Sequence, residues 1–435
     1  MYEWLNRQFE LRARGSTVGR ELRGAIATFL TMAYILFVNP GILGAAGVPF
    51  DAAITATALA AGICSILMGL FANFPIALAS GMGLNAIVAF AITTKAGSWQ
   101  AAMGLVVLDG IVTLVLVLVG LREAVMRAIP YALRQATGAG IGLFIAFIGL
   151  VNAKIVIAGP NGGPPVQPGT WHNHETAVAV AGLLVTAVLI AKRVKGALII
   201  GILATTVIAL LVGVTHLPNE FHWPVLGGVM FHADIRAALK LSLMPLLFAL
   251  IMVDFIDTLG SATAIAEEGG LIDDRTGQIP RMRNILMIDS LSASIGGLLG
   301  ASSVTCYVES AAGVAEGART GLHSVFVGVL FLLSILAAPI VGIVPGAATA
   351  PALILVGFLM MAQIAKIDFN DLQNAIPAFI TLIAIPLTYS IAHGIGYGFI
   401  AFVVNKLVSG NFREVHPVMY GATLAFVAYF VFGVA

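Results

Sequence analysis

The chain has 435 residues, of which 59% are hydrophobic and only 10% are charged, and its formal net charge is +1. This composition excludes a soluble globular protein, and the near-neutral charge indicates no particular partner. The apolar stretches are long enough to cross a bilayer as helices, and the short alternating segments of a transmembrane β-barrel are absent. The sequence therefore predicts an all-α, polytopic membrane protein.

Apolar runs follow one another along the whole chain and predict thirteen to fifteen membrane crossings. In the first half they lie at 24–44, 51–73, 78–94, 101–121, 135–157, 175–191 and 197–215. After a polar stretch they continue at 241–265, 284–300, 304–317, 320–343, 347–365, 375–390, 392–408 and 417–434. The runs at 78–94 and 304–317 are short or interrupted by glycine, which is typical of half-helices and not of full crossings.

Positive charges predict the orientation of these crossings. The chain before and around the start of the first run carries Arg7, Arg12, Arg14, Arg20 and Arg23. Placing this end in the cytoplasm puts most of the later lysines and arginines on the same side, as the positive-inside rule requires. We therefore expect a multi-pass protein of the cell (inner or cytoplasmic) membrane with a cytoplasmic N-terminus that is not a signal peptide.

The two halves of the chain show a weak internal repeat. Pro130 is followed twelve residues later by Gly142, and Pro345 is followed twelve residues later by Gly357. Seven crossings separate the related elements, and because seven is an odd number the two repeats must be inverted relative to each other.

The two broken runs also match each other. Leu84-Asn85-Ala86 in the first run corresponds to Val308-Glu309-Ser310 in the second. Non-helical backbone at membrane depth is tolerated only where it is buried in protein or lines a cavity. Paired broken helices in inverted repeats therefore indicate a binding site near the membrane midplane.

Few acidic residues lie inside the predicted crossings, namely Asp109, Asp254, Asp257, Asp289 and Glu309, whereas Glu316 precedes Gly317 and Arg319 and is expected at the cytoplasmic exit, paired there. An ionised carboxylate without a partner costs several kcal/mol in the membrane interior, so each needs a partner, a proton or a water-filled cavity. No lysine or arginine within the crossings is an obvious partner. These carboxylates are therefore candidates for reversible protonation, which coupling to a proton gradient requires.

Asp254 and Asp257 are three residues apart and share a helix face, so their charges repel each other when both are ionised. This pair predicts a substrate acceptor combined with a proton site; the alternative is a polar pair that only holds helices together. Glu309 and Asn85 could bind the edge of a flat heterocycle, because a carboxylate accepts two parallel N–H donors and an amide both donates and accepts. The alternative for Asn85 is a hydrogen bond between helices.

Other activities lack sequence support. The metalloprotease pattern HExxH, the hydrolase pattern GxSxG, a cluster of histidine ligands and a channel-type filter repeat are all missing from the predicted crossings. We therefore expect no enzyme, no catalytic residue, no metal and no cofactor. Asp109 and Asp289 are single polar groups in ordinary crossings, and we interpret them as structural contacts between helices.

Four motifs resemble a known family. They are ATFLTMAYILFVNPGIL at 27–43, GMGLNA at 81–86, VDFIDT at 253–258 and SSVTCYVESAAGVAEGARTGL at 302–322. Together they resemble the AzgA-like purine permeases, a branch of the nucleobase–cation symporters, and the resemblance runs in order from about residue 15 to 410.

The resemblance implies the fold of the bacterial uracil permease, with about fourteen segments in two inverted repeats of seven, 1–215 and 216–435. Segments 1–4 and 8–11 would form a core domain, and segments 5–7 and 12–14 a gate domain. The additional run at 417–434 leaves the topology of 375–435 open.

The resemblance also implies roles for single residues. The positions that contact substrate in such permeases are matched by Asn85, Asp254, Glu309, Tyr307 and the backbone at Val308. Asp257 matches the second aspartate of the eighth segment, which is linked to proton coupling together with Asp254. The chain departs from the family pattern at Ser80, where proline is usual, and at Glu316, where a small or neutral residue is usual.

The function that follows is proton-coupled uptake of a purine nucleobase by alternating access, with the proton as the coupling ion. The expected partners are the base, the lipid bilayer and a second copy of the chain in a possible homodimer; no nucleic acid is expected. Residue types alone leave the choice between adenine and guanine or hypoxanthine open. The alternatives keep the fold and change the substrate to a pyrimidine, xanthine or a small anion such as sulfate, although Glu309 and Asp254 would repel an anion.

Overall fold

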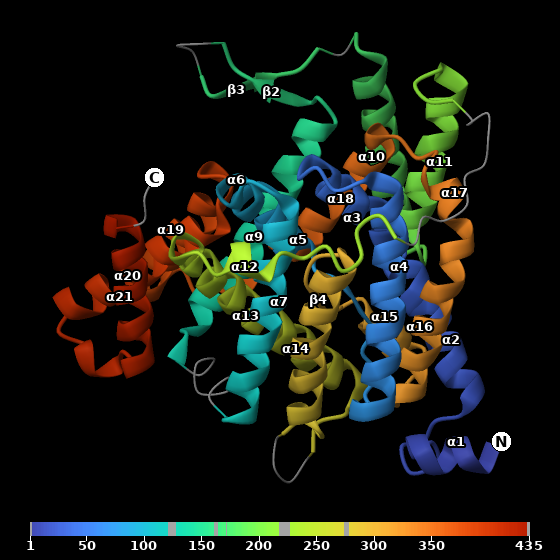
Figure 1. The fold of residues 1–435 in the computed structure, drawn as a ribbon, viewed down its shortest axis with the longest axis horizontal. Coiled ribbons are helices and arrows are strands. Elements are labelled where there is room, and N and C mark those ends of the chain that lie inside the picture. Colours follow the sequence, from blue (N-terminus) through green and yellow to red (C-terminus); the bar gives the residue numbers. More distant parts are fainter. Residues whose placement is uncertain are drawn as a thin grey trace.

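The computed structural model describes residues 2–120, 128–160, 164–170, 172–216, 227–273 and 278–432, which form a bundle of helices (Figure 1). In this part of the chain, eight helices are long and apolar enough to cross a membrane, and five shorter helices are also apolar. The predicted helical membrane fold is therefore confirmed. The described residues also form two small antiparallel sheets of two strands each, whereas the sequence predicted an all-α fold.

The first seven segments occupy the N-terminal half. They are α2 (Val18–Met32) with α3 (Ile35–Ala45), α4 (Phe50–Leu67), β1 (Leu78–Ser80) with α5 (Met82–Ala86) and α6 (Thr93–Ala96), α7 (Trp99–Leu118), α9 (Tyr131–Asn152), α10 (His174–Ala191) and α11 (Ala197–Val212). A π-helical stretch, Ile87–Ile92, joins α5 to α6. A short helix α1 (Tyr2–Phe9) precedes them, and the hairpin of β2 (Val156–Ala158) and β3 (Val166–Pro168) follows α9.

The second seven segments follow in the same order. They are α13 (Met244–Gly269), α14 (Met282–Leu299), β4 (Val304–Cys306) with α15 (Ser310–Ala315), α16 (Gly321–Ser334) with α17 (Ala338–Val341), α18 (Gly346–Met361), α19 (Leu372–Leu387) and α20 (Ile391–Val408). The stretch 375–408 thus forms two separate helices, and α21 (Pro417–Phe432) follows as a further one. A short helix α12 (Ile235–Ala238) precedes α13.

The contacts between segments occur in matched pairs. When each segment of a contact is replaced by the one seven positions away in the chain, the matching contact is found. The contact of α4 with α16 is matched by that of α14 with α7, and the contact of α10 with α18 by that of α19 with α9. Likewise α10 packs on α11 as α19 packs on α20, while α9 with α18 and β1 with β4 are each their own counterpart. This pattern is that of two inverted repeats of seven. Helix α21 lies outside it and contacts α13 and α20.

The glycines that revealed the repeat in the sequence touch each other where α9 crosses α18. A methyl group on Gly142 would lie 2.7 Å from the carbonyl oxygen of Gly357, and one on Gly357 would lie 2.4 Å from the carbonyl oxygen of Gly142. Small residues let helix backbones approach closely in a membrane, where packing replaces the hydrophobic effect as the source of helix association.

The variant Gly357→Ala should therefore lower the apparent melting temperature of the detergent-purified protein. Forcing a methyl group into this contact costs about 1–3 kcal/mol, as overpacking does elsewhere. The matched control is Gly421→Ala in α21, because no atom lies within 4 Å of a methyl group placed there. Equal melting temperatures for the two variants would contradict the close helix crossing.

The two broken segments meet in the middle of the bundle as the strand pair β1–β4. Ala79 lies opposite Thr305 in an antiparallel register. The amide of Gly81 donates to the carbonyl of Ser303, and that of Tyr307 donates to the carbonyl of Ala77, which extends the pairing at both ends. These bonds satisfy the backbone groups that broken helices leave exposed inside a membrane.

The structure corrects the sequence match between the two broken segments. One residue separates β1 from α5, whereas three residues, 307–309, separate β4 from α15. Glu309 is consequently the N-cap of α15, while Asn85 lies within α5. The two residues are not equivalent positions of the repeat, because Asn85 follows the end of β1 by five residues whereas Glu309 follows the end of β4 by three.

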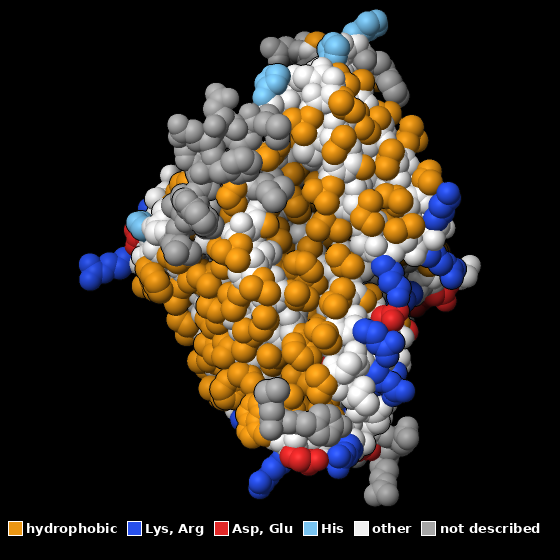
Figure 2. Space-filling view, turned by 90° about the vertical axis from the view of Figure 1, so that its right-hand side faces the viewer, with side chains coloured by type: hydrophobic (Ala, Val, Ile, Leu, Met, Phe, Trp, Pro, Cys, Tyr) orange, Lys and Arg blue, Asp and Glu red, His pale blue; other side chains and the backbone are white. Residues whose placement is uncertain are grey.

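One face of the molecule is covered mainly by hydrophobic side chains, and the charged side chains lie at its margins, many of them along the right-hand edge and at the lower end (Figure 2). Helices α10 and α11 expose Leu184, Val188, Leu203, Val207 and Leu211. An apolar surface of this extent fits contact with lipid acyl chains.

Candidate functional site

Glu309 stands at the strand-to-helix turn of the second broken segment and is half-buried. Its Oε1 accepts a hydrogen bond of 2.7 Å from the hydroxyl of Tyr34, a fully buried residue at the turn between α2 and α3. The carboxylate of Asp257, from α13, is close enough to interact electrostatically with Glu309 and with Asp289 of α14. Segments 1, 8, 9 and 10 thus bring one tyrosine and three carboxylates together.

Asp289 fixes the strand that leads into this turn. Its Oδ2 accepts a hydrogen bond of 2.7 Å from Thr258, and its Oδ1 accepts one of 3.2 Å from the amide of Cys306 and one of 3.3 Å from the hydroxyl of Thr305. Asp289 is completely buried. These contacts are those of a positioning residue, in line with the structural interpretation drawn from the sequence, although they place it beside Asp257.

Asn85 belongs to a second buried network of hydrogen bonds, separate from that of Glu309. Its amide nitrogen donates to Oδ1 of Asn39 over 2.6 Å, and the amide of Asn39 donates to the hydroxyl of Thr57 over 2.9 Å and to the carbonyl of Ala301 over 3.1 Å. The side-chain oxygen of Asn85 is buried and accepts no hydrogen bond in the described part of the chain. Buried acceptors are normally hydrogen-bonded, so this oxygen lacks a donor that the described residues do not supply.

Both hydrogen-bond networks include a residue of α3 or its N-cap. Tyr34 is the N-cap of α3, and Asn39 lies within that helix. Glu309 and Asn85 are therefore linked through segment 1, which the sequence did not predict. The only sequence signals were one tyrosine and one asparagine within the apolar run at 24–44.

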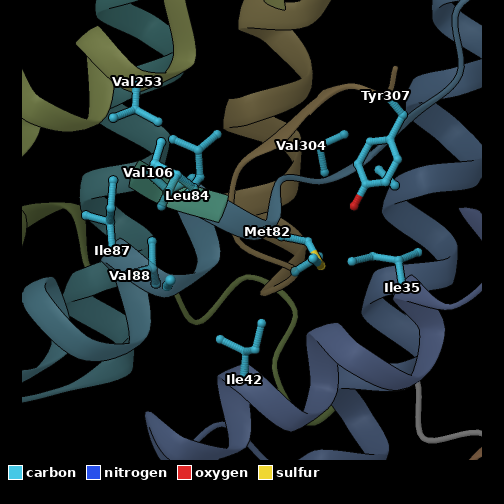
Figure 3. Close-up of a cluster of buried hydrophobic side chains, with 14 of the residues drawn as sticks. Ile35, Ile42, Met82, Leu84, Ile87, Val88, Val106, Val253, Val304 and Tyr307 are labelled. Atoms are coloured by element: carbon cyan, nitrogen blue, oxygen red, sulfur yellow. The ribbon is translucent and has the colours of Figure 1, made fainter. Parts of the chain in front are cut away.

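The remaining predicted residues take different positions. Tyr307 is buried and its hydroxyl donates to the carbonyl of Ser80 over 2.6 Å, across the strand pair. Figure 3 shows its ring in the same apolar cluster as Met82 and Ile35. The side chain of Val308 is 49% exposed, next to Glu309, whereas Asp254 is fully buried in α13.

A further buried carboxylate, which the sequence analysis did not single out, caps the N-terminal end of α16. Glu21 in α2 accepts hydrogen bonds from the amides of Arg319, Thr320 and His323 at 3.0, 3.4 and 3.2 Å. A carboxylate at a helix N-terminus satisfies free amides and complements the helix dipole. His323 also forms a 2.8 Å hydrogen bond with Thr28. This cap fixes the turn that joins α15 to α16.

Glu316, the residue that the family pattern does not explain, lies at the exposed end of α15 and forms an ion pair with Lys195. The hydrogen bond from Lys195 and its charge hold the pKa of Glu316 below the ordinary value. Lys195 belongs to the turn between α10 and α11, so this pair joins segment 10 to the turn between segments 6 and 7.

Comparison with known proteins places these features in a family context. The model of the permease family matches residues 19–397. Adenine permease AdeP of Escherichia coli is 39% identical over 98% of this chain and 96% of its own, and guanine/hypoxanthine permease PbuG of Bacillus subtilis is 40% identical over 98% and 99%. The transmembrane domain of a cyanobacterial bicarbonate transporter, BicA, superposes with a TM-score of 0.65 at 18% identity, over 86% of this chain and 96% of its own. That likeness shows the fold alone.

Proposed function

We propose that this chain, which belongs to the permease family, carries purine nucleobases across the cytoplasmic membrane together with protons. The chain is a multi-pass membrane permease and not an enzyme. Its full-length likeness to an adenine permease and to guanine/hypoxanthine permeases supports a purine as the substrate.

The observation that carries this proposal is the position of Glu309. It is an acid inside the bundle, at the turn of a broken segment, held by the hydroxyl of Tyr34. No salt bridge neutralises Glu309 or Asp257 in the part of the chain that the structure describes. Purines present N–H donors along one edge, and a carboxylate that keeps a free oxygen binds such donors with charge-assisted hydrogen bonds.

Other residues complete the proposed site. The unsatisfied oxygen of Asn85 accepts a further N–H of the base, and Asp254 holds the opposite edge. The ring of Tyr307 and the backbone at Val308 line the pocket. This assignment is supported by the motif match and by the shared link of Glu309 and Asn85 to segment 1.

Proton coupling is assigned to Asp257, with Asp254 as the other candidate. The carboxylate of Asp257 interacts electrostatically with those of Asp289 and Glu309, and carboxylates that share one site share a proton between them. A proton taken up from outside would stabilise the loaded state and leave on the cytoplasmic side. In this scheme the core (segments 1–4 and 8–11) moves against the gate (segments 5–7 and 12–14), with the N-terminus in the cytoplasm and a homodimer formed through the gate.

Competition for uptake tests the proposed substrate. Cells that express the protein and lack their own purine permeases should accumulate radiolabelled hypoxanthine or adenine. Unlabelled purines should compete, whereas uracil and sulfate should not, and a protonophore should abolish accumulation. Competition by sulfate, or by uracil alone, would contradict the proposal and favour another substrate on the same fold.

The hydroxyl of Tyr34 is predicted to orient Glu309 for the base. We expect Tyr34→Phe to raise the KM for purine uptake at least about 10-fold, because hydrogen bonds to charged groups contribute about 1.5–3 kcal/mol and about 1.4 kcal/mol corresponds to a factor of ten. The matched control is Tyr420→Phe, which also removes a hydroxyl and one hydrogen bond, to the carbonyl of Phe412, outside the site. An unchanged KM in Tyr34→Phe would show that this contact does not serve binding.

A further inference from the structure

A pocket that Glu309 does not line is found where the half-helix of segment 3 ends. It is a cavity of about 590 Å³ between α6, the start of α13, the turn after α19, α20 and α21. Its size falls within the range of roughly 300–1,000 Å³ that is usual for small-molecule sites. Its lining includes Phe90, Lys95, Tyr389, His393, Tyr397 and Phe430.

Aromatic rings form two walls of this pocket. On α20 and α21, the ring of Phe430 lies 5.3 Å from that of His393 and 5.0 Å from that of Tyr397, both tilted. On the other wall, Phe90 meets Tyr389 edge to face at 5.4 Å. Aromatic walls of this kind favour a flat ring, because stacking and edge contacts with aromatic side chains add to the burial of its faces.

Polar donors lie at the border of the same walls. The ammonium of Lys95 is 5.2 Å from the centre of the Tyr429 ring, and no carboxylate in the described ranges forms an ion pair with it. The hydroxyl of Ser390 contacts Nδ1 of His393 at 2.8 Å, which leaves Nε2 for a ligand. A cation and an imidazole beside aromatic rings recognise a flat ring that carries oxygen or nitrogen acceptors.

One helical run carries residues of both the pocket and the proposed central site. Phe90 is five residues beyond Asn85 in the continuous stretch 82–96, which corresponds to about 7.5 Å along the helix axis. The opposite wall depends on α21, the helix that has no counterpart in the two repeats. The pocket is therefore an addition to the symmetric fold and not a product of it.

We propose that this pocket is a second binding site for a planar nitrogen heterocycle, and that it takes up a purine base before the base reaches Glu309. The inference rests on the proposed function, because it assigns the same class of substrate to both sites. The aromatic walls hold the ring faces, and Lys95 and His393 contact the acceptor atoms at its edge. Helix α21 closes the site through Tyr429 and Phe430.

Equilibrium dialysis of radiolabelled hypoxanthine against the purified protein in nanodiscs tests this proposal. The wild-type protein should bind two molecules per chain with different affinities. Glu309→Gln should lose the tighter site and keep the weaker one. In the double variant Glu309→Gln/Tyr397→Ala, the remaining affinity should fall at least tenfold. The control Glu309→Gln/Tyr131→Ala removes an exposed tyrosine outside the pocket and should keep it.

The outcomes separate the two proposals. A single site in the wild type, lost completely in Glu309→Gln, would overturn the second pocket and leave the proposed function intact. Two sites that both persist in Glu309→Gln would contradict the central assignment; the single variant Tyr397→Ala then tests the pocket, which is supported if one of the two sites is lost and contradicted if both remain. The binding of anionic lipid is compared in nanodiscs with and without phosphatidylglycerol. If Lys95→Gln and Tyr397→Ala change only the bound anionic lipid, the pocket is a lipid site and the proposal is wrong.

Discussion

Replacing Glu309 with glutamine is expected to reduce kcat/KM for purine uptake by about 100-fold or more. The substitution keeps the size of the side chain and its hydrogen bond with Tyr34, but removes the charge that binds the N–H donors of the base. Charge-assisted hydrogen bonds contribute about 1.5–3 kcal/mol each, and about 1.4 kcal/mol corresponds to a factor of ten. The measurement is initial uptake of radiolabelled hypoxanthine and adenine in cells without other purine permeases.

The matched control is Glu316→Gln, the same substitution seven residues along the same segment. Glu316 forms an ion pair with Lys195 at the exposed end of α15, and exposed ion pairs have small effects. Uptake by this variant should remain within about threefold of the wild type. Equal uptake by Glu309→Gln and Glu316→Gln, at equal amounts of protein in the membrane, would remove Glu309 from the site.

Replacing Asp257 with asparagine is expected to uncouple transport from the proton gradient. The amide resembles the protonated acid in shape, so the loaded carrier still forms, but it cannot release a proton. In proteoliposomes with an imposed pH gradient, accumulation of hypoxanthine should fall at least tenfold. Exchange of external for internal hypoxanthine, which needs no net proton movement, should stay within about threefold of the wild type.

Asp51→Asn serves as the control for this variant, because Asp51 is exposed in the first turn of α4. It should show normal accumulation and normal exchange. Accumulation by Asp257→Asn at the wild-type level would assign the coupling proton elsewhere, with Asp254 as the next candidate. Loss of exchange as well as accumulation would show that Asp257 is needed for binding and not for coupling alone.

The broken segments could be predicted from the sequence, because glycines and a carboxylate interrupt apolar runs at corresponding places in the two halves. The inverted repeat could be predicted for the same reason, and Gly142 and Gly357 meet at its centre. The offset between Asn85 and Glu309 could not be predicted. It depends on the hydrogen-bond register between β1 and β4, which are more than two hundred residues apart in the chain.

The hydrogen-bond partners of the predicted site residues could not be predicted from the sequence either. Tyr34 and Asn39 lie in an apolar run whose pattern does not show which helix face each one occupies, and both contacts cross to distant segments. In the sequence Glu21 is one of several charges near the N-terminus, yet it caps α16 some three hundred residues later. Side-chain pairing between segments of this separation follows from the tertiary fold and not from local pattern.

The central claim is that a purine and a proton cross together, and the proton movement caused by purine entry tests it most directly. Proteoliposomes that contain a trapped pH indicator and no initial gradient are given hypoxanthine outside. The internal pH should fall as hypoxanthine enters, and it should stay constant with sulfate or with Glu309→Gln. Entry of hypoxanthine at the normal rate without any change in internal pH would contradict proton symport.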